Sequence, residues 1–172
     1  MLYFSHPGCL DHEMLPGHPE RPDRLRAVEK HLSNTGLMSD LICVDAEPVE
    51  MAMVAAIHDP TYLEKLASMV PEEGLAALDP DTALCPASLR AARLATGAAT
   101  QATLQVLDGR DKRAFCAIRP PGHHAEHGTA MGFCLLNSIA VAADVALKRP
   151  GIDRVAILDF DVHQTARARV AL

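Results

Sequence analysis

The stretch VAILDFDVH, residues Val155–His163, combines a strand signal with a group of candidate ligands. Its first six residues form a short, mostly apolar run, which is typical of a strand buried in a sheet. Because the side chains of a strand alternate between its two faces, Asp159, Asp161 and His163 should point the same way, and the apolar residues between them should pack on the other face. The stretch therefore predicts a buried strand that ends in three polar side chains.

Similar apolar runs precede this stretch, and helical patterns lie between them. The predicted strands are Leu2–Phe4, Leu41–Val44, Ala114–Ile118 and Val155–Phe160. The predicted helices are Pro22–Ser33, Pro60–Met69, Pro86–Leu107 and Leu135–Lys148. Parallel strands need crossover connections, and helices supply these connections while they cover the sheet. The predicted fold class is therefore α/β, a three-layer parallel sheet with helices on both faces.

Length and composition set the broad class. The chain has 172 residues, of which 49% are hydrophobic, so we expect residues 1–172 to form a single domain or part of a larger one. The net charge is −6 and the basic residues are scattered, which argues against a nucleic-acid partner. Five cysteines without a C-x-x-C pair indicate reduced thiols in the cytoplasm. The sequence shows neither a signal peptide nor an apolar stretch of membrane-spanning length, so we expect no membrane partner.

The predicted strand Val155–Phe160 would place its polar end at the carboxyl edge of the sheet, where open parallel sheets bind their ligands. A carboxylate and an imidazole two residues apart, such as Asp161 and His163, can hold one divalent cation, and mixed nitrogen and oxygen donors favour zinc. The alternative interpretation is structural. In it, Asp159 caps a helix or pairs with an arginine, and His163 is an ordinary surface residue.

A second polar group, RPPGHHAEHGTAMGFCLLN at Arg119–Asn137, follows the predicted strand Ala114–Ile118 and should reach the same edge of the sheet. Two histidines, His123 and His124, stand next to each other in it. Adjacent imidazoles repel when both are charged, which favours a neutral ring that can act as a general base near neutral pH. The alternative is a histidine-rich surface loop.

The same loop contains a rival motif. HHAEH, residues His123–His127, matches H-x-x-E-H, in which two histidines bind zinc and the glutamate, here Glu126, is the base of a metallopeptidase. That chemistry needs both histidines on one continuous helix. A Pro-Pro-Gly sequence precedes the motif and a glycine follows it, so a helix is not favoured there.

Several motifs in order resemble the histone deacetylase family, in particular its bacterial class II-like and acetylpolyamine amidohydrolase branch. The motifs are RPPGHHA at Arg119–Ala125, GFC at Gly132–Cys134 with Asn137, LDFDVH at Leu158–His163, HPERPDRL at His18–Leu25 and, more loosely, AIHDPTYL at Ala56–Leu63. The resemblance covers most of residues 1–163. It implies the arginase/deacetylase-like fold.

The resemblance implies zinc-dependent hydrolysis of an acetyl amide on a lysine or a polyamine. Asp161 and His163 would be two of three ligands of Zn2+. His124 would be the general base that takes a proton from zinc-bound water, and His123 would be its cationic neighbour, oriented by Asp159. In such a site the metal polarises the amide carbonyl and the histidines move protons.

The resemblance also implies roles outside the zinc centre. Gly132 and Phe133 would line the substrate tunnel, and carbonyl groups of the D-x-D-x-H strand would contribute to a structural K+ site. Asp79 and Asp81, in LDPDT, have two interpretations. They lie at the rim of the tunnel and bind substrate, or they cap the helix that follows.

The sequence departs from the family after His163. The family continues with a second histidine and a Gly-Asn/Asp-Gly turn, whereas residues 164–172 here form an atypical tail, QTARARVAL. No carboxylate follows Asp161 to act as the third ligand. The two tyrosines, Tyr3 and Tyr62, lack the motif context of the tyrosine with which the family stabilises the oxyanion. The sequence therefore predicts the N-terminal portion of a deacetylase-like domain, truncated after the D-x-D-x-H motif.

This incompleteness leads to two further expectations. Deacetylase activity would be impaired or absent, because the ligand set and the oxyanion donor are partial. The alternative to an enzyme is a catalytically inactive remnant or a partner subunit. A parallel sheet that stops at its central strands also leaves an unpaired edge, so we expect self-association through that edge.

Overall fold

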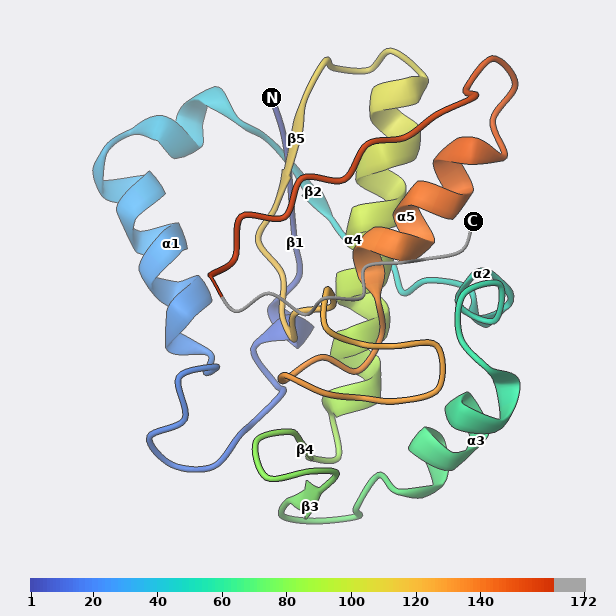
Figure 1. Cartoon of the computed structure of the whole chain (residues 1–172). Coiled ribbons are helices and arrows are strands. Elements are labelled where there is room, and N and C mark those ends of the chain that lie inside the picture. The colour runs from blue at the N-terminus through green and yellow to red at the C-terminus, as the bar shows by residue number, and fades with distance from the viewer. Residues whose placement is uncertain (163–172) are drawn as a thin grey trace.

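A computed structural model describes residues 1–162, which are built on a three-stranded parallel sheet (Figure 1). Strand β1 (Leu2–Ser5) lies in the centre, with β2 (Ile42–Asp45) on one side and β5 (Ala114–Cys116) on the other. The register places the first residues of the three strands side by side. The strands predicted from the first three apolar runs are therefore confirmed.

Helices cover both faces of this sheet. On one face, Leu2 and Phe4 of β1 pack with residues of α4 (Ser88–Leu107). On the other face, Tyr3 belongs to a core cluster that includes residues of α1 (Asp23–Asn34). Successive side chains of β1 thus enter opposite cores, as the two-residue period of a strand requires. The predicted α/β fold with three layers is confirmed.

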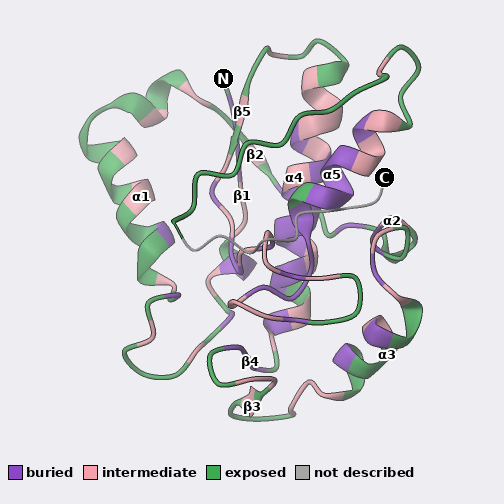
Figure 2. Cartoon of the chain, viewed as in Figure 1, coloured by how far each residue is buried: buried purple, intermediate pink, exposed green. Residues whose placement is uncertain are grey.

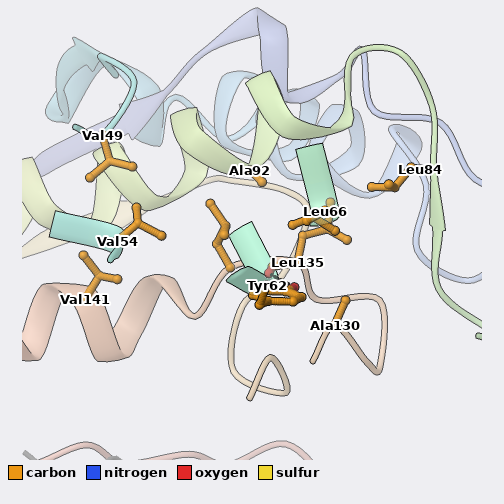
Figure 3. Close-up of a cluster of buried hydrophobic side chains, with 10 residues drawn as sticks. Val49, Val54, Tyr62, Leu66, Leu84, Ala92, Ala130, Leu135 and Val141 are labelled. Carbon is orange, nitrogen blue, oxygen red and sulfur yellow. Dashed lines mark hydrogen bonds between the residues drawn. The ribbon is translucent and has the colours of Figure 1, made fainter. Parts of the chain in front are cut away.

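A further core lies between α4 and the helices α2 (Met51–Val54), α3 (Pro60–Ser68) and α5 (Ser138–Leu147). Figure 3 shows side chains of this cluster pointing toward one another, and Figure 2 shows that buried residues line the sides of α4 and α5. The cluster consists of Val49, Val54, Tyr62, Leu66, Leu84, Ala92, Ala130, Leu135, Leu136 and Val141. The helices predicted in these regions are confirmed, with α5 beginning three residues later than expected.

Five short elements were not predicted. They are the one-turn helix α2, the 3-10 helices η1 (Pro7–Cys9) and η2 (Leu37–Asp40) and the antiparallel pair β3 (Ala76–Ala77) and β4 (Ala83–Leu84). The β3–β4 pair brings the LDPDT segment to one end of the molecule, below the sheet in Figure 1. Within residues 1–162, no helix combines the length and the apolar character that a membrane crossing requires.

The strand predicted at Val155–Phe160 is wrong. After α5 the chain crosses in front of the sheet in an extended path and pairs with no described strand (Figure 1). Phe160 is 94% exposed and Val162 is 87% exposed, so the apolar residues do not pack on a second face. An apolar run becomes a strand only when a neighbouring backbone accepts its hydrogen bonds, and the described chain places none beside this one.

Candidate active site

A cavity of about 860 Å3 opens beyond the carboxyl end of β5. Segments from four regions of the sequence form its walls, and most of its polar residues come from the motifs described above. The residues that line it are Pro19, Glu20, Arg24, Asp79, Pro80, Asp81, Pro121, His123, His124, Met131, Gly132, Phe133 and Asp161. The structure thus gathers most of the predicted site at the predicted edge of the sheet.

The two adjacent histidines lie against each other and against the extended segment that follows α5. The ring centroids of His123 and His124 are 4.0 Å apart. His123 Nδ1 is 2.8 Å from a carboxylate oxygen of Asp159, which is 36 residues away in the sequence. The backbone N–H of Asp161 donates to the other oxygen of Asp159 at 3.0 Å. Both hydrogen bonds lower the pKa of Asp159, and the bond from the Asp161 N–H has a larger effect than the bond with His123.

Asp161 is the described part of the predicted zinc site. Its carboxylate lines the cavity and lies 4.0 Å from His123 Nε2. An exposed carboxylate beside imidazole nitrogens is donor chemistry that suits zinc. His163, the second predicted ligand, lies outside the described residues. Within residues 1–162, no three His, Cys, Asp or Glu side chains are grouped closely enough to hold a metal ion.

Gly132 and Phe133, the predicted substrate-binding residues, form one wall of the cavity. A β-carbon at Gly132 would lie 2.6 Å from Cδ2 of His124, so only glycine fits against that ring. Phe133 has a φ of 68°, and its N–H donates to the Thr82 hydroxyl at 3.1 Å. The ring of His18 meets the ring of Phe133 edge-on, with centroids 4.5 Å apart. An aromatic wall is therefore held in place from two sides.

Cys134 links this wall to the histidines. The N–H of His124 donates to its sulfur at 3.4 Å, and the thiol donates to the carbonyl of Gly132 at 3.3 Å. Burial raises the pKa of the Cys134 thiol to about 12. The thiol therefore stays protonated near neutral pH, where it serves as a hydrogen-bond bridge.

The two aspartates of LDPDT have different surroundings. Both line the cavity, but one oxygen of Asp79 accepts the N–H groups of Asp81 at 2.9 Å and Thr82 at 2.6 Å. Although partial burial favours the neutral form, these hydrogen bonds lower the pKa of Asp79. Helix α4 begins at Ser88 without a side-chain cap, so the interpretation of these aspartates as helix caps is wrong. Asp79 shapes the turn, whereas Asp81 accepts the Thr82 hydroxyl at 3.2 Å through one oxygen.

Sequence reasoning missed a buried ion pair, one member of which, Glu20, lines the cavity. Arg119 Nε and Nη2 donate to the two carboxylate oxygens of Glu20 at 2.8 and 2.7 Å, and both side chains are almost fully buried. Arg119 Nη1 also donates to the carbonyls of Cys9 and His12 at 2.9 and 2.5 Å. Glu20 in HPERP and Arg119 in RPPGHH carry opposite charges, which is a signal for an ion pair. Only the fold, however, brings the two residues together. The pair anchors the start of the two-histidine loop, Gly122–Gly128, to the N-terminal segment.

The metallopeptidase interpretation is wrong. His123–His127 forms turns rather than a helix, so its two histidines are not presented on one helical face. The ring of His127 instead lies at a surface position, with Nδ1 2.6 Å from the carbonyl of Ile57. The backbone N–H of Glu126 donates to the carbonyl oxygen of Thr129 at 2.9 Å, which closes the loop on itself.

Comparison with known proteins agrees with this geometry. The histone deacetylase domain matches residues 18–166. The chain is 45% identical over 157 residues to the protein slr0245 of Synechocystis sp., covering 90% of this chain and 51% of that protein. It is 38% identical over 147 residues to the histone deacetylase-like amidohydrolase of Pseudomonas aeruginosa, covering 86% of this chain and 38% of that protein.

A solved structure also shows similarity to a histone deacetylase domain. The crystal structure of the HDA15 HD domain is similar with a TM-score of 0.79 and 33% identity, covering 85% of this chain and 44% of that one. The chain thus spans about half the length of these relatives or less. The matched domain contains the two-histidine loop together with Asp159 and Asp161. His123, His124 and Asp161 line one cavity, and Asp159 contacts His123. The chain therefore belongs to the histone deacetylase family.

Proposed function

We propose that this chain carries the catalytic histidines of a zinc-dependent deacetylase that acts on acetyl-lysine or on an acetylpolyamine. The observation that supports this most directly is the contact between His123 and Asp159 at the cavity, with His124 packed against His123. A carboxylate that accepts the Nδ1 hydrogen of an imidazole orients the ring and stabilises its cationic form. Such a pair beside a second histidine provides one group to take a proton and one to carry positive charge.

Each residue has a distinct role in this proposal. His124 takes the proton from the attacking water, and His123, oriented by Asp159, supplies positive charge beside the developing oxyanion. Asp161 and His163 would hold zinc, whose chemistry when bound is to polarise the acetyl carbonyl and to acidify water. Carbonyl groups of the segment around Asp159 would hold a structural potassium ion.

The walls of the cavity suit a long aliphatic arm with a polar end. Phe133 and Gly132 offer an apolar surface for the methylene chain of an acetylated lysine or polyamine. Asp81, at the LDPDT turn, is a rim carboxylate for the peptide N–H or for a free ammonium group of the substrate. Opposite charges attract more strongly in a partly enclosed cavity than in bulk water.

The remaining assignments are also proposals. We place the chain in the cytoplasm, where its five free cysteines would stay reduced. Residues 1–172 would act as one domain, with residues 164–172, outside the described part, as an atypical tail. Its partners would be the acetylated substrate and, through the edge of the sheet, further copies of the chain, without nucleic acid or membrane.

The test is hydrolysis of an acetyl-lysine peptide and of an acetylpolyamine by the purified chain, with and without added zinc. We expect any zinc-dependent release of acetate to be weak and to fall by a factor of about 100 or more in His124→Ala. Zinc binding, measured by calorimetry, should weaken in Asp161→Ala and persist in His124→Ala. A folded chain that binds zinc without turnover would instead support the inactive remnant or partner subunit.

A further inference from the structure

The motif AIHDPTYL, Ala56–Leu63, has no role in the proposed chemistry, yet two of its side chains reach the active-site wall. Tyr62 donates its hydroxyl to the carbonyl of Leu135 at 2.7 Å. The backbone N–H of Asn137 donates to Nε2 of His58 at 2.9 Å. His58 is completely buried, and its ring centroid lies 5.5 Å from that of Tyr62. The motif therefore holds the segment that leads from the cavity wall into α5.

The second nitrogen of His58 faces the two-histidine loop. Nδ1 lies 3.3 Å from the carbonyl oxygen of His127, which also accepts the N–H of Asp59 at 2.9 Å. Because Nε2 already accepts the amide hydrogen of Asn137, it carries no hydrogen of its own. The neutral ring must then have its hydrogen on Nδ1, where it can be donated to His127. One tautomer satisfies both neighbours.

Asn137 extends the connection. Its Nδ2 donates to the carbonyl of Ala125 at 2.9 Å, and its Oδ1 caps α5 by accepting the N–H of Ala140 at 3.1 Å. The two-histidine loop is thus held at Ala125 by the Asn137 side chain and at His127 by His58. Ala125 directly follows His124, so these contacts act one residue away from the proposed base.

We propose that His58 is a positioning residue for the two-histidine loop: as a neutral imidazole with its hydrogen on Nδ1, it joins the backbone at the start of α5 to the carbonyl of His127. A protonated ring would direct a second N–H at the amide of Asn137 and would break this connection. Burial lowers the pKa of His58, which keeps the ring neutral. The inference rests on the proposed function in one respect, which is that the two-histidine loop carries the catalytic base.

The tautomer can be observed directly. Long-range 1H–15N NMR spectra of the His58 ring should show the Nδ1–H form, unchanged between pH 8 and pH 6. His31, an exposed residue of α1, provides a solvent-exposed reference ring in the same spectra. An Nε2–H pattern, or a charged His58 ring at pH 6, would overturn the inference.

The positioning role is tested by amide hydrogen exchange in variants, a measurement that needs neither zinc nor turnover. In His58→Ala, exchange at Asn137 and at Ala125 and Glu126 should become about tenfold faster or more. His58→Gln, whose amide can both accept and donate, should restore most of the protection. His31→Ala should leave these amides unchanged.

The outcome remains decisive if His58→Ala does not fold. His58→Phe keeps the ring volume without either hydrogen bond, and it should show the same local loss of protection. Unchanged exchange in the loop of a folded His58→Phe or His58→Ala variant would show that His58 only fills the core. Because exchange is read without substrate, a chain that lacks deacetylase activity would refute the proposed function and leave this inference standing.

Discussion

Gly132 is pressed against the ring of His124, and its backbone has a φ of +54°. Gly132→Ala should cost about 1 kcal/mol for the left-handed backbone and roughly 1–3 kcal/mol more because the new methyl group displaces the His124 ring. Gly109→Ala is the matched control, since Gly109 has a φ of +76° and open space around it. Urea denaturation should show the larger loss of stability in Gly132→Ala only, together with shifted His124 ring resonances. Equal losses in the two variants would contradict the contact.

His12 gives the stability of the fold a pH dependence. Its ring is fully buried, with Nδ1 2.8 Å from the Ser88 hydroxyl and Nε2 3.7 Å from a carboxylate oxygen of Glu20. Burial, the largest cause, lowers the pKa of His12 from 6.5 to about 4, although Glu20 opposes the shift. The folded chain therefore binds fewer protons than the unfolded chain between these pH values.

The free energy of unfolding should consequently be highest above pH 6.5 and should fall as the pH drops toward 4, by up to about 3 kcal/mol from this residue. Urea denaturation between pH 7.5 and pH 4.5 measures the slope. His12→Gln keeps a polar side chain but cannot titrate, so its slope should be shallower. A variant with the same slope as the natural chain would assign the pH dependence to other groups.

At the scale of elements, the Arg119–Glu20 pair joins the loop after β5 to the segment before α1. Removing Glu20 leaves the buried Arg119 charge with backbone carbonyls as its partners, and removing Arg119 leaves the buried Glu20 carboxylate with the half-exposed Arg24 at 3.3 Å. Breaking a buried pair in this way typically costs 3–5 kcal/mol. We expect Arg119→Met and Glu20→Met each to destabilise the chain by about that amount in urea denaturation. The double variant Arg119→Met with Glu20→Met should lose less than the sum, because neither charge remains. Additive losses would mean that the two side chains do not act as a pair.

Local periodicity predicts the elements whose formation depends mainly on their own residues and not on one particular neighbour. β1, β2, β5 and the helices α1, α3, α4 and α5 follow from apolar runs, turn residues and helical spacing. The segment Val155–Phe160 has an equally good strand pattern, but a strand also needs a neighbour, and a single sequence does not say which backbone will lie beside it.

The candidate site divides in the same way. Sequence motifs predicted many of the residues that line the cavity, because the residue types and their spacing indicate the chemistry of these residues. The contacts that hold them were not predicted, since they join positions 79 and 99 residues apart, as in His58 with Asn137 and Glu20 with Arg119. Such pairs depend on the packed fold, and both include residue types that are mostly exposed in proteins.

At the scale of the whole molecule, an apolar cavity of about 460 Å3 is lined by residues of α4, α5 and the edge strand β5. Val106, Cys116 and Ile139 are among its lining residues, and no described strand covers the outer edge of β5. Leu158 and Phe160 of the extended segment add exposed apolar surface. An open strand edge with apolar surface beside it favours pairing with another chain.

We therefore expect the purified chain to self-associate through this edge, with a mass that rises with concentration in light scattering coupled to gel filtration. Ile139→Lys places a charge at the mouth of the cavity, where Ile139 is 43% exposed, and should shift the chain toward the monomer. Leu15→Lys changes a residue that is 54% exposed but lies outside the cavity, so it should leave the association unchanged. A natural chain that is monomeric at all concentrations, or equal dissociation by both variants, would show that this edge is not the surface through which copies meet.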